Sequence, residues 1–146
     1  MDAGKINTVA AVAKSTEQKS AKAFKVSQQG HQQHCEQLTQ LQTFKQEYET
    51  RLGVIGEQGM DARQLQDYRL FLNKLNQAIE KQSEEVQASE ESLGETREQW
   101  LAESRHRSAL DHLVEQHHKQ HIQARDKAEQ KESDEKTLTR MATKDR

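Results

Sequence analysis

The sequence predicts an all-α fold, an elongated antiparallel two-helix coiled-coil hairpin, and three observations predict it. The 146 residues contain no proline, and Gln, Glu, Lys, Ala, Arg and Leu, all good helix formers, dominate the chain. Apolar residues recur at alternating steps of three and four along two long stretches, which is the period of a coiled-coil seam. Three of the six glycines lie between these stretches, within residues 53–59.

The composition leaves two alternatives, disorder or an extended fold with a thin apolar seam. Only 32% of the residues are hydrophobic and 32% are charged, whereas a compact domain of this length buries more apolar side chain. Disorder is typical of low hydrophobicity combined with high net charge. The net charge is only −2, so the extended helical fold is the better interpretation.

The second stretch carries the clearer heptad repeat. Its phase does not slip over fifty residues, which predicts a left-handed supercoil. With Leu65 at position a, its a and d positions are Leu65, Tyr68, Leu72, Leu75, Ile79, Gln82, Val86, Ser89, Leu93, Thr96, Trp100, Glu103, Arg107, Leu110 and Val114.

The first stretch carries the same repeat with smaller side chains. The seam is firm from Leu38 onward and rich in alanine before that, so it buries less area there. Its a and d positions are Ala3, Ile6, Ala10, Ala13, Glu17, Ser20, Phe24, Ser27, His31, His34, Leu38, Leu41, Lys45, Tyr48, Leu52 and Ile55.

The glycine-rich segment between the stretches is interpreted as a hairpin loop within one domain, residues 1–146. We expect helix 1 over about 3–52, the loop over 53–60 and helix 2 over about 61–140. Gly53 is the expected left-handed residue that closes helix 1. Asp61, with Gln64 three residues later, has the spacing of a capping box at the start of helix 2.

The chain beyond about residue 114 has no partner within the hairpin. Folding back about the loop places Ile6 near Leu110, so the remainder of helix 2 overhangs. This segment is polar on nearly every face, and a single polar helix is marginal in water. We expect it to be frayed when free and ordered by a partner; the alternative is a disordered tail without a role.

Charge and motifs exclude several function classes. The 22 basic and 24 acidic residues leave no net positive charge to favour nucleic acid. We expect no transmembrane segment, no secretory signal, no disulfide at the single Cys35 and no cofactor. No phosphate loop, nucleophile elbow or carboxylate pair is recognisable, so the protein is predicted not to be an enzyme.

The histidines are the one group that suggests metal chemistry. His117 and His121 are four residues apart and could reach one ion from one helix face. No acidic or thiol ligand completes the set, so solvated histidines and no metal are the prediction. His31 and His34 lie on the seam and should face the layer of Gln82, as a polar layer that fixes register.

The residues beside the loop predict a protein-binding surface. Phe44 and Phe71 fall at g positions, and in an antiparallel pair the two g flanks lie on the same side. The alternative is a widened core in which the aromatic rings cover the seam. A partly exposed apolar patch on a very polar hairpin marks a binding surface, and its g and d positions are Gln37, Leu41, Phe44, Tyr48, Phe71, Leu75, Ala78 and Gln82.

Four segments carry a resemblance to a known family. Their order and spacing, over nearly the whole chain, resemble the FliJ family of flagellar export proteins. The segments are "FKQEYETRL" (44–52), "DYRLFLNKLNQAIEKQ" (67–82), "REQW" (97–100) and "EQKESDEKTLTRMATK" (129–144).

The resemblance implies a coiled-coil hairpin like the central stalk of rotary ATPases. Such proteins work at the cytoplasmic face of the inner membrane in the flagellar type III export apparatus. They bind the hexameric export ATPase FliI and the cytoplasmic domain of the export gate FlhA, and they escort substrate-specific export chaperones. We expect a monomer when the protein is free.

The resemblance also assigns the two ends of the hairpin. The gate-contacting stripe coincides with the eight g and d residues above, although Phe44 replaces a tyrosine-like position and Gln82 stands where histidine can occur. A stalk of a virulence type III secretion system and an unrelated coiled-coil scaffold or chaperone are the alternatives. The implied ATPase-binding end carries both termini and includes Ile6, Val9, Ala13, Gln130, Lys131, Asp134, Glu135 and Arg140.

Overall fold

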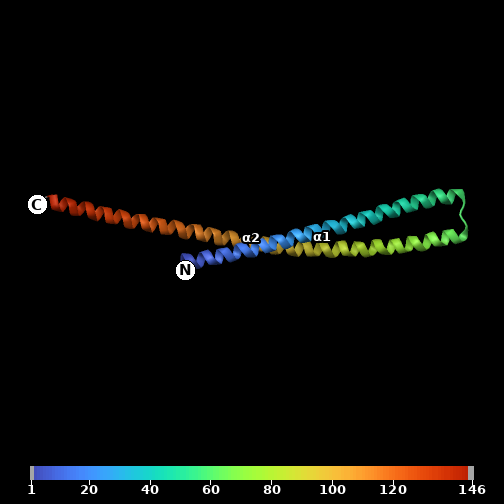
Figure 1. Cartoon of the computed structure of the whole chain (residues 1–146), viewed down its shortest axis with the longest axis horizontal. Helices are drawn as coiled ribbons and strands as arrows, with labels where there is room; N and C mark the ends of the chain where they lie inside the picture. Colours follow the sequence, from blue (N-terminus) through green and yellow to red (C-terminus); the bar gives the residue numbers. More distant parts are fainter. Residues whose placement is uncertain (1, 145–146) are drawn as a thin grey trace. The chain divides into compact units, whose positions relative to one another are not determined.

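The computed structural model describes residues 2–144 as two long α-helices that run antiparallel (Figure 1). Helix α1 spans Ala3–Gln58, 56 residues, and α2 spans Ala62–Lys144, 83 residues. No strand occurs within the described residues. The all-α coiled-coil hairpin predicted from the heptad repeat is confirmed.

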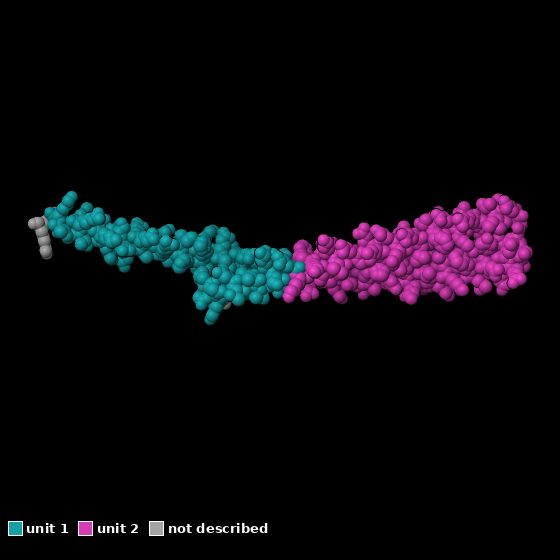
Figure 2. All heavy atoms as spheres, in the orientation of Figure 1, with its two compact units in different colours: residues 1–18, 101–146 teal, residues 19–100 magenta. Residues whose placement is uncertain are grey.

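The chain divides into two compact units, each containing a segment of both helices (Figure 2). Unit 2 is residues 19–100 and contains the turn. Unit 1 combines residues 2–18 with the described part of 101–146.

In unit 2 the two helices pack along the predicted heptad seam. Every predicted a and d position from Ser20 to Trp100 is at least partly buried, with the exception of Leu65 beside the turn. Leu75 is the most buried apolar residue of the unit, and Phe24 stacks on Trp100 with ring centroids 5.6 Å apart. The phase read from the sequence is therefore the phase in which the side chains pack.

In unit 1 the first turns of α1 pack on α2 through Ile6 and Ala13, which are both buried. Arg107 makes two ion pairs next to these residues. Its Nη1 lies 3.0 Å from Glu17 Oε2 on α1, and its Nε lies 3.6 Å from Asp111 Oδ2 on α2. The paired part of this unit ends at about His117.

Beyond that point α2 continues as a single helix, drawn in orange and red in Figure 1. Every described residue from His118 to Lys144 is exposed. Ion pairs four residues apart line this segment, such as Arg125 with Glu129 at 3.5 Å and Lys136 with Glu132 at 3.5 Å. Such exposed pairs add about 0.3–0.5 kcal/mol each to helix stability.

The turn is shorter than the sequence analysis expected, and two of its bounds are wrong. Helix α1 continues six residues past 52, and only residues 59–61 lie between the two helices. The residue that closes α1 is Gly59, at φ +95°, and not Gly53. The Gly59 amide donates to the Gly56 carbonyl at 3.3 Å, a bond typical of a left-handed helix terminus.

The physical reason is that glycine weakens a helix without ending it. One interior glycine costs about 1 kcal/mol relative to alanine, which flanking packing at Leu52 and Ile55 offsets. The start of α2 agrees with the prediction, because the Asp61 carboxylate accepts a hydrogen bond from the Gln64 amide at 2.7 Å, as an N-cap side chain does.

Two alanine substitutions separate these roles. Gly59→Ala should lower the free energy of unfolding by about 1–2 kcal/mol, because an L side chain is strained in the left-handed region. Gly53→Ala should raise it by up to about 1 kcal/mol, because position 53 is helical and open. Urea unfolding followed by circular dichroism checks both; equal effects of the two substitutions would contradict the assignment of the turn.

Candidate protein-binding site

Four aromatic rings cluster beside the turn in unit 2. Tyr48 lies at the centre, with ring centroids 4.6 Å from Phe71, 5.4 Å from Tyr68 and 6.5 Å from Phe44. Phe44 and Phe71 meet edge to face across the two helices at 6.2 Å. Aromatic pairs of this kind each contribute about 0.5–1.5 kcal/mol beyond their buried area.

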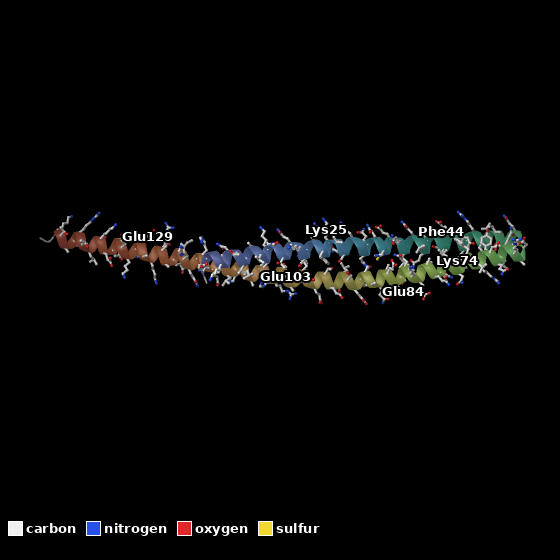
Figure 3. All side chains as sticks on the ribbon, turned by 60° about the horizontal axis from the view of Figure 1, so that its bottom comes forward. Lys25, Phe44, Lys74, Glu84, Glu103 and Glu129 are labelled. Atoms are coloured by element: carbon white, nitrogen blue, oxygen red, sulfur yellow. The ribbon has the colours of Figure 1, made fainter. Side chains whose placement is uncertain are left out.

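The outer two rings of the cluster remain open to solvent. Phe44 is 46% exposed and Phe71 41% exposed, and Figure 3 shows Phe44 near the turn end of α1. The prediction that these two g residues lie level on one flank is confirmed. Both rings also contact Tyr48 of the seam, so they cover the seam on one side and face solvent on the other.

The eight predicted stripe residues separate into a surface row and a supporting row. The g residues project outward, while the d residues lie beneath them in the seam. Leu75 is buried and so supports the stripe from below instead of lining its surface. The exposed residues are Gln37, Phe44, Phe71 and Ala78, and the half-buried residues are Leu41, Tyr48 and Gln82.

Polar contacts fix the far end of the stripe. Gln82 Nε2 donates to the His34 carbonyl at 3.0 Å and to Gln37 Oε1 at 3.2 Å. These contacts cross between the helices and use both amide protons of Gln82. These contacts hold the Gln82 side chain in the seam. Gln37, its partner at position g, is exposed, whereas Gln82 is half-buried.

Of the two seam histidines, His34 faces the predicted layer and His31 does not. His34 meets Gln82 as predicted, but His31 Nδ1 lies 2.9 Å from Ser89 Oγ, two seam positions further along α2. The Ser89 hydroxyl also lies 2.8 Å from the Val86 carbonyl, to which it donates, and His31 Nε2 lies 3.5 Å from the Cys35 thiol. All three contacts are satisfied together when His31 Nδ1 carries the proton, because it then donates to Ser89 while Nε2 accepts from Cys35. This chain of contacts pins the register.

The residues predicted for the opposite end of the hairpin lie in unit 1, and they differ in accessibility. Ile6 and Ala13 are buried against α2, so they hold the helices together and offer no surface in the free chain, whereas Val9 is 42% exposed. The remaining predicted residues are all exposed on the unpaired part of α2 and are Gln130, Lys131, Asp134, Glu135 and Arg140.

Comparison with known proteins identifies the family. A family model described as "Flagellar FliJ protein" matches residues 1–146, the whole chain. The chain belongs to the flagellar FliJ protein family. A search of curated proteins and a search of solved structures each found no significant match.

Membership of the FliJ family places this chain in flagellum biogenesis and type III protein export. The flagellar match favours flagellar export over the virulence secretion alternative. Neither helix, over the residues that the structure describes, has a stretch long and apolar enough to cross a membrane.

Sequence reasoning missed one apolar residue next to the stripe of this FliJ-family chain. Leu70 is 56% exposed and occupies position f, directly before Phe71. Heptad analysis assigns position f to solvent, and therefore it gave no reason to include this side chain.

The histidines of unit 1 do not gather into a metal site. His117, His118 and His121 line a small cavity of about 170 Å³ with Ala3, Ile6, Asn7 and Val114. Within residues 2–144 no group of three His, Cys, Asp or Glu side chains has an arrangement that could hold a metal ion.

The pKa of Tyr48, the central ring of the aromatic cluster, is shifted. Burial in the aromatic cluster, and secondarily the Tyr68 phenol, raises the pKa of Tyr48 above its ordinary value of 10.0. Because the folded-state pKa is raised, the neutral phenol favours the folded state. Its contribution to stability is present below pH 10.0 and is lost as the pH rises through the folded-state pKa.

Alkaline titration tests this packing. In the Tyr68→Phe variant Tyr48 is the only tyrosine, since the chain has two, and burial, the larger cause, remains. Its tyrosinate absorbance should appear at a higher pH in the folded variant than in the same variant unfolded in urea. Coincident titrations would show that Tyr48 is not packed as described.

Proposed function

We propose that this FliJ-family chain is a non-enzymatic stalk that couples the export ATPase FliI to the export gate FlhA. In the same proposal it escorts substrate-specific export chaperones, and it works in the cytoplasm at the inner-membrane face of the export apparatus. The observation that carries the proposal is the exposed aromatic pair, Phe44 and Phe71, beside the turn.

The stripe has the properties of a gate-binding surface. Rings anchor protein interfaces because they bury a large area with little loss of side-chain entropy. Here Phe44 and Phe71 contact each other and the Tyr48 ring, which limits their motion before binding. A surface organised in this way avoids part of the entropy cost of association. These properties support FlhA binding through the outward row of the stripe.

The end with both termini supports the ATPase contact. The paired turns of α1 give a stable base, and the single helix beyond His117 exposes every described side chain. An unpaired, charged helix can insert into a ring of subunits and contact several of them without first separating from its own partner helix. Gln130, Lys131 and Arg140 lie in this segment.

Substitution of the aromatic pair tests gate binding. Phe44→Ala combined with Phe71→Ala should weaken binding of the FlhA cytoplasmic domain at least about tenfold, since each lost ring anchor commonly costs over 1 kcal/mol. Helicity should be retained, because neither ring is buried. Isothermal titration calorimetry with the purified gate domain measures the effect.

A control removes two apolar side chains of the unpaired segment that are more exposed than the two phenylalanines. Leu138→Ala with Met141→Ala, at 66% and 62% exposure, should leave gate binding unchanged. Wild-type affinity in the aromatic double variant, or equal loss in the control, would contradict the assignment of the stripe.

Truncation tests the ATPase contact. A chain ending at residue 129 keeps the paired part of both helices but lacks Gln130, Lys131 and Arg140. We expect the full chain to promote ring assembly by FliI in the presence of nucleotide, as seen by electron microscopy, and the truncated chain to lose this activity. Undiminished ring assembly by the truncated chain would remove this segment from the proposed contact.

A further inference from the structure

A second apolar surface lies in unit 1, and it too is built on residues at position g. Val9, at position g of α1, is 42% exposed, and Leu113, at position g of α2, is 45% exposed. The Glu17–Arg107 contact at 3.0 Å sets the pairing in this unit, and counting outward from it places Leu113 level with residue 11, between Val9 and Val12. Val9 and Leu113 have the same heptad position, g, as Phe44 and Phe71 near the turn.

The surface extends along both helices. Val12, one turn from Val9 at the adjacent c position, is 61% exposed, and Ala109 is the corresponding exposed residue on α2. The Thr8 and Thr16 hydroxyls donate to carbonyls of their own helix, at 2.8 and 3.0 Å from Gly4 O and Val12 O. The threonines beside the valines thus have their hydrogen-bond donors satisfied.

Charge around this surface is one-sided. The c, f and g positions over 5–16 and 102–120 include Lys5, Arg105 and Lys119 but no aspartate or glutamate, and Lys119 is paired with Glu115 at 3.7 Å. Apart from Asp2, the carboxylates of the paired part of unit 1 lie in the seam, as Glu17 does, or on the opposite flank. Asp2, at the edge of this face, is engaged as the N-cap, because its Oδ1 accepts from the Lys5 amide at 2.8 Å.

We propose that the Val9–Val12–Leu113 face binds an amphipathic helix of a partner protein whose flanks carry carboxylates. Apolar side chains at i, i+3 and i+4 spacing on such a helix match the two rows of apolar residues. Its carboxylates lie opposite Lys5 and Arg105, where opposite charges favour this partner over a basic one. The inference goes beyond the proposed function, since it names a surface shared by both helices and the chemistry of its ligand. It shares Val9 with the end that the resemblance assigns to the ATPase, and it does not depend on gate binding.

Two synthetic helical peptides of about 20 residues serve as the probes. Both carry leucines at the same heptad spacing; one has glutamates on its flanks and the other has lysines. In fluorescence anisotropy with the full chain, the glutamate peptide should bind at least about tenfold more tightly, which corresponds to about 1.4 kcal/mol. Equal binding of the two peptides, or binding of neither, overturns the proposal.

The chain offers a closely matched control. Val12 and Val26 are the same residue type, occupy the same heptad position c, and are each 61% exposed, but Val26 lies in unit 2. Val12→Glu should abolish binding of the glutamate peptide, and Val26→Glu should leave it unchanged. Equal effects of the two substitutions overturn the assignment of the face, and circular dichroism verifies that both variants are folded.

Two further arms separate this inference from its alternatives. Lys5→Gln with Arg105→Gln should reduce the preference for the glutamate peptide about tenfold while leaving FlhA binding intact, so the gate proposal can fail or succeed independently. Vesicles of phosphatidylserine and phosphatidylcholine test a lipid ligand. Val12-dependent binding to vesicles without binding of the glutamate peptide overturns the proposal in favour of a membrane surface.

Discussion

The heptad phase of the seam is the constraint on which the other features depend. A chain with 32% hydrophobic residues has few apolar side chains to bury, and the constant phase places many of the larger ones between the helices, while others such as Val12 and Phe44 remain exposed. Polar layers share the seam, as at Glu17–Arg107 and His31–Ser89. In the part that the structure describes no buried side-chain polar atom lacks a hydrogen-bond partner, so these layers select one register at low energetic cost.

The binding surfaces follow from this register. Position g lies beside the seam, and in an antiparallel pair the g residues of both helices share one flank. A large apolar residue there is partly supported by the seam and partly open to solvent, as Phe44 and Phe71 are. A slip of one residue would move these rings apart and turn d residues such as Leu75 toward solvent. The packing that stabilises unit 2 is therefore also what presents its aromatic surface.

The sequence was sufficient to predict the two helices, their heptad phase and the position of Phe44 beside Phe71, because each of these depends on a periodic signal. It was less reliable at the turn. Gly53, Gly56 and Gly59 are equivalent by composition, and only the backbone conformation shows which one ends α1. Leu70 was missed because an isolated leucine at position f carries no periodic signal. The heptad pattern placed Ile6 and Ala13 in the seam, where they are buried, whereas their assignment to a binding end came from the resemblance alone.

The register itself is the claim to test most directly. Spin labels at Gln40 and Lys74, exposed c positions on the same side of unit 2, with Cys35 replaced by serine, report it by double electron–electron resonance. The structure predicts one narrow distance distribution in solution. A broad distribution, or a second population displaced by the roughly 10 Å of one heptad of helix, would contradict a single register and with it the positioning of Phe44 beside Phe71.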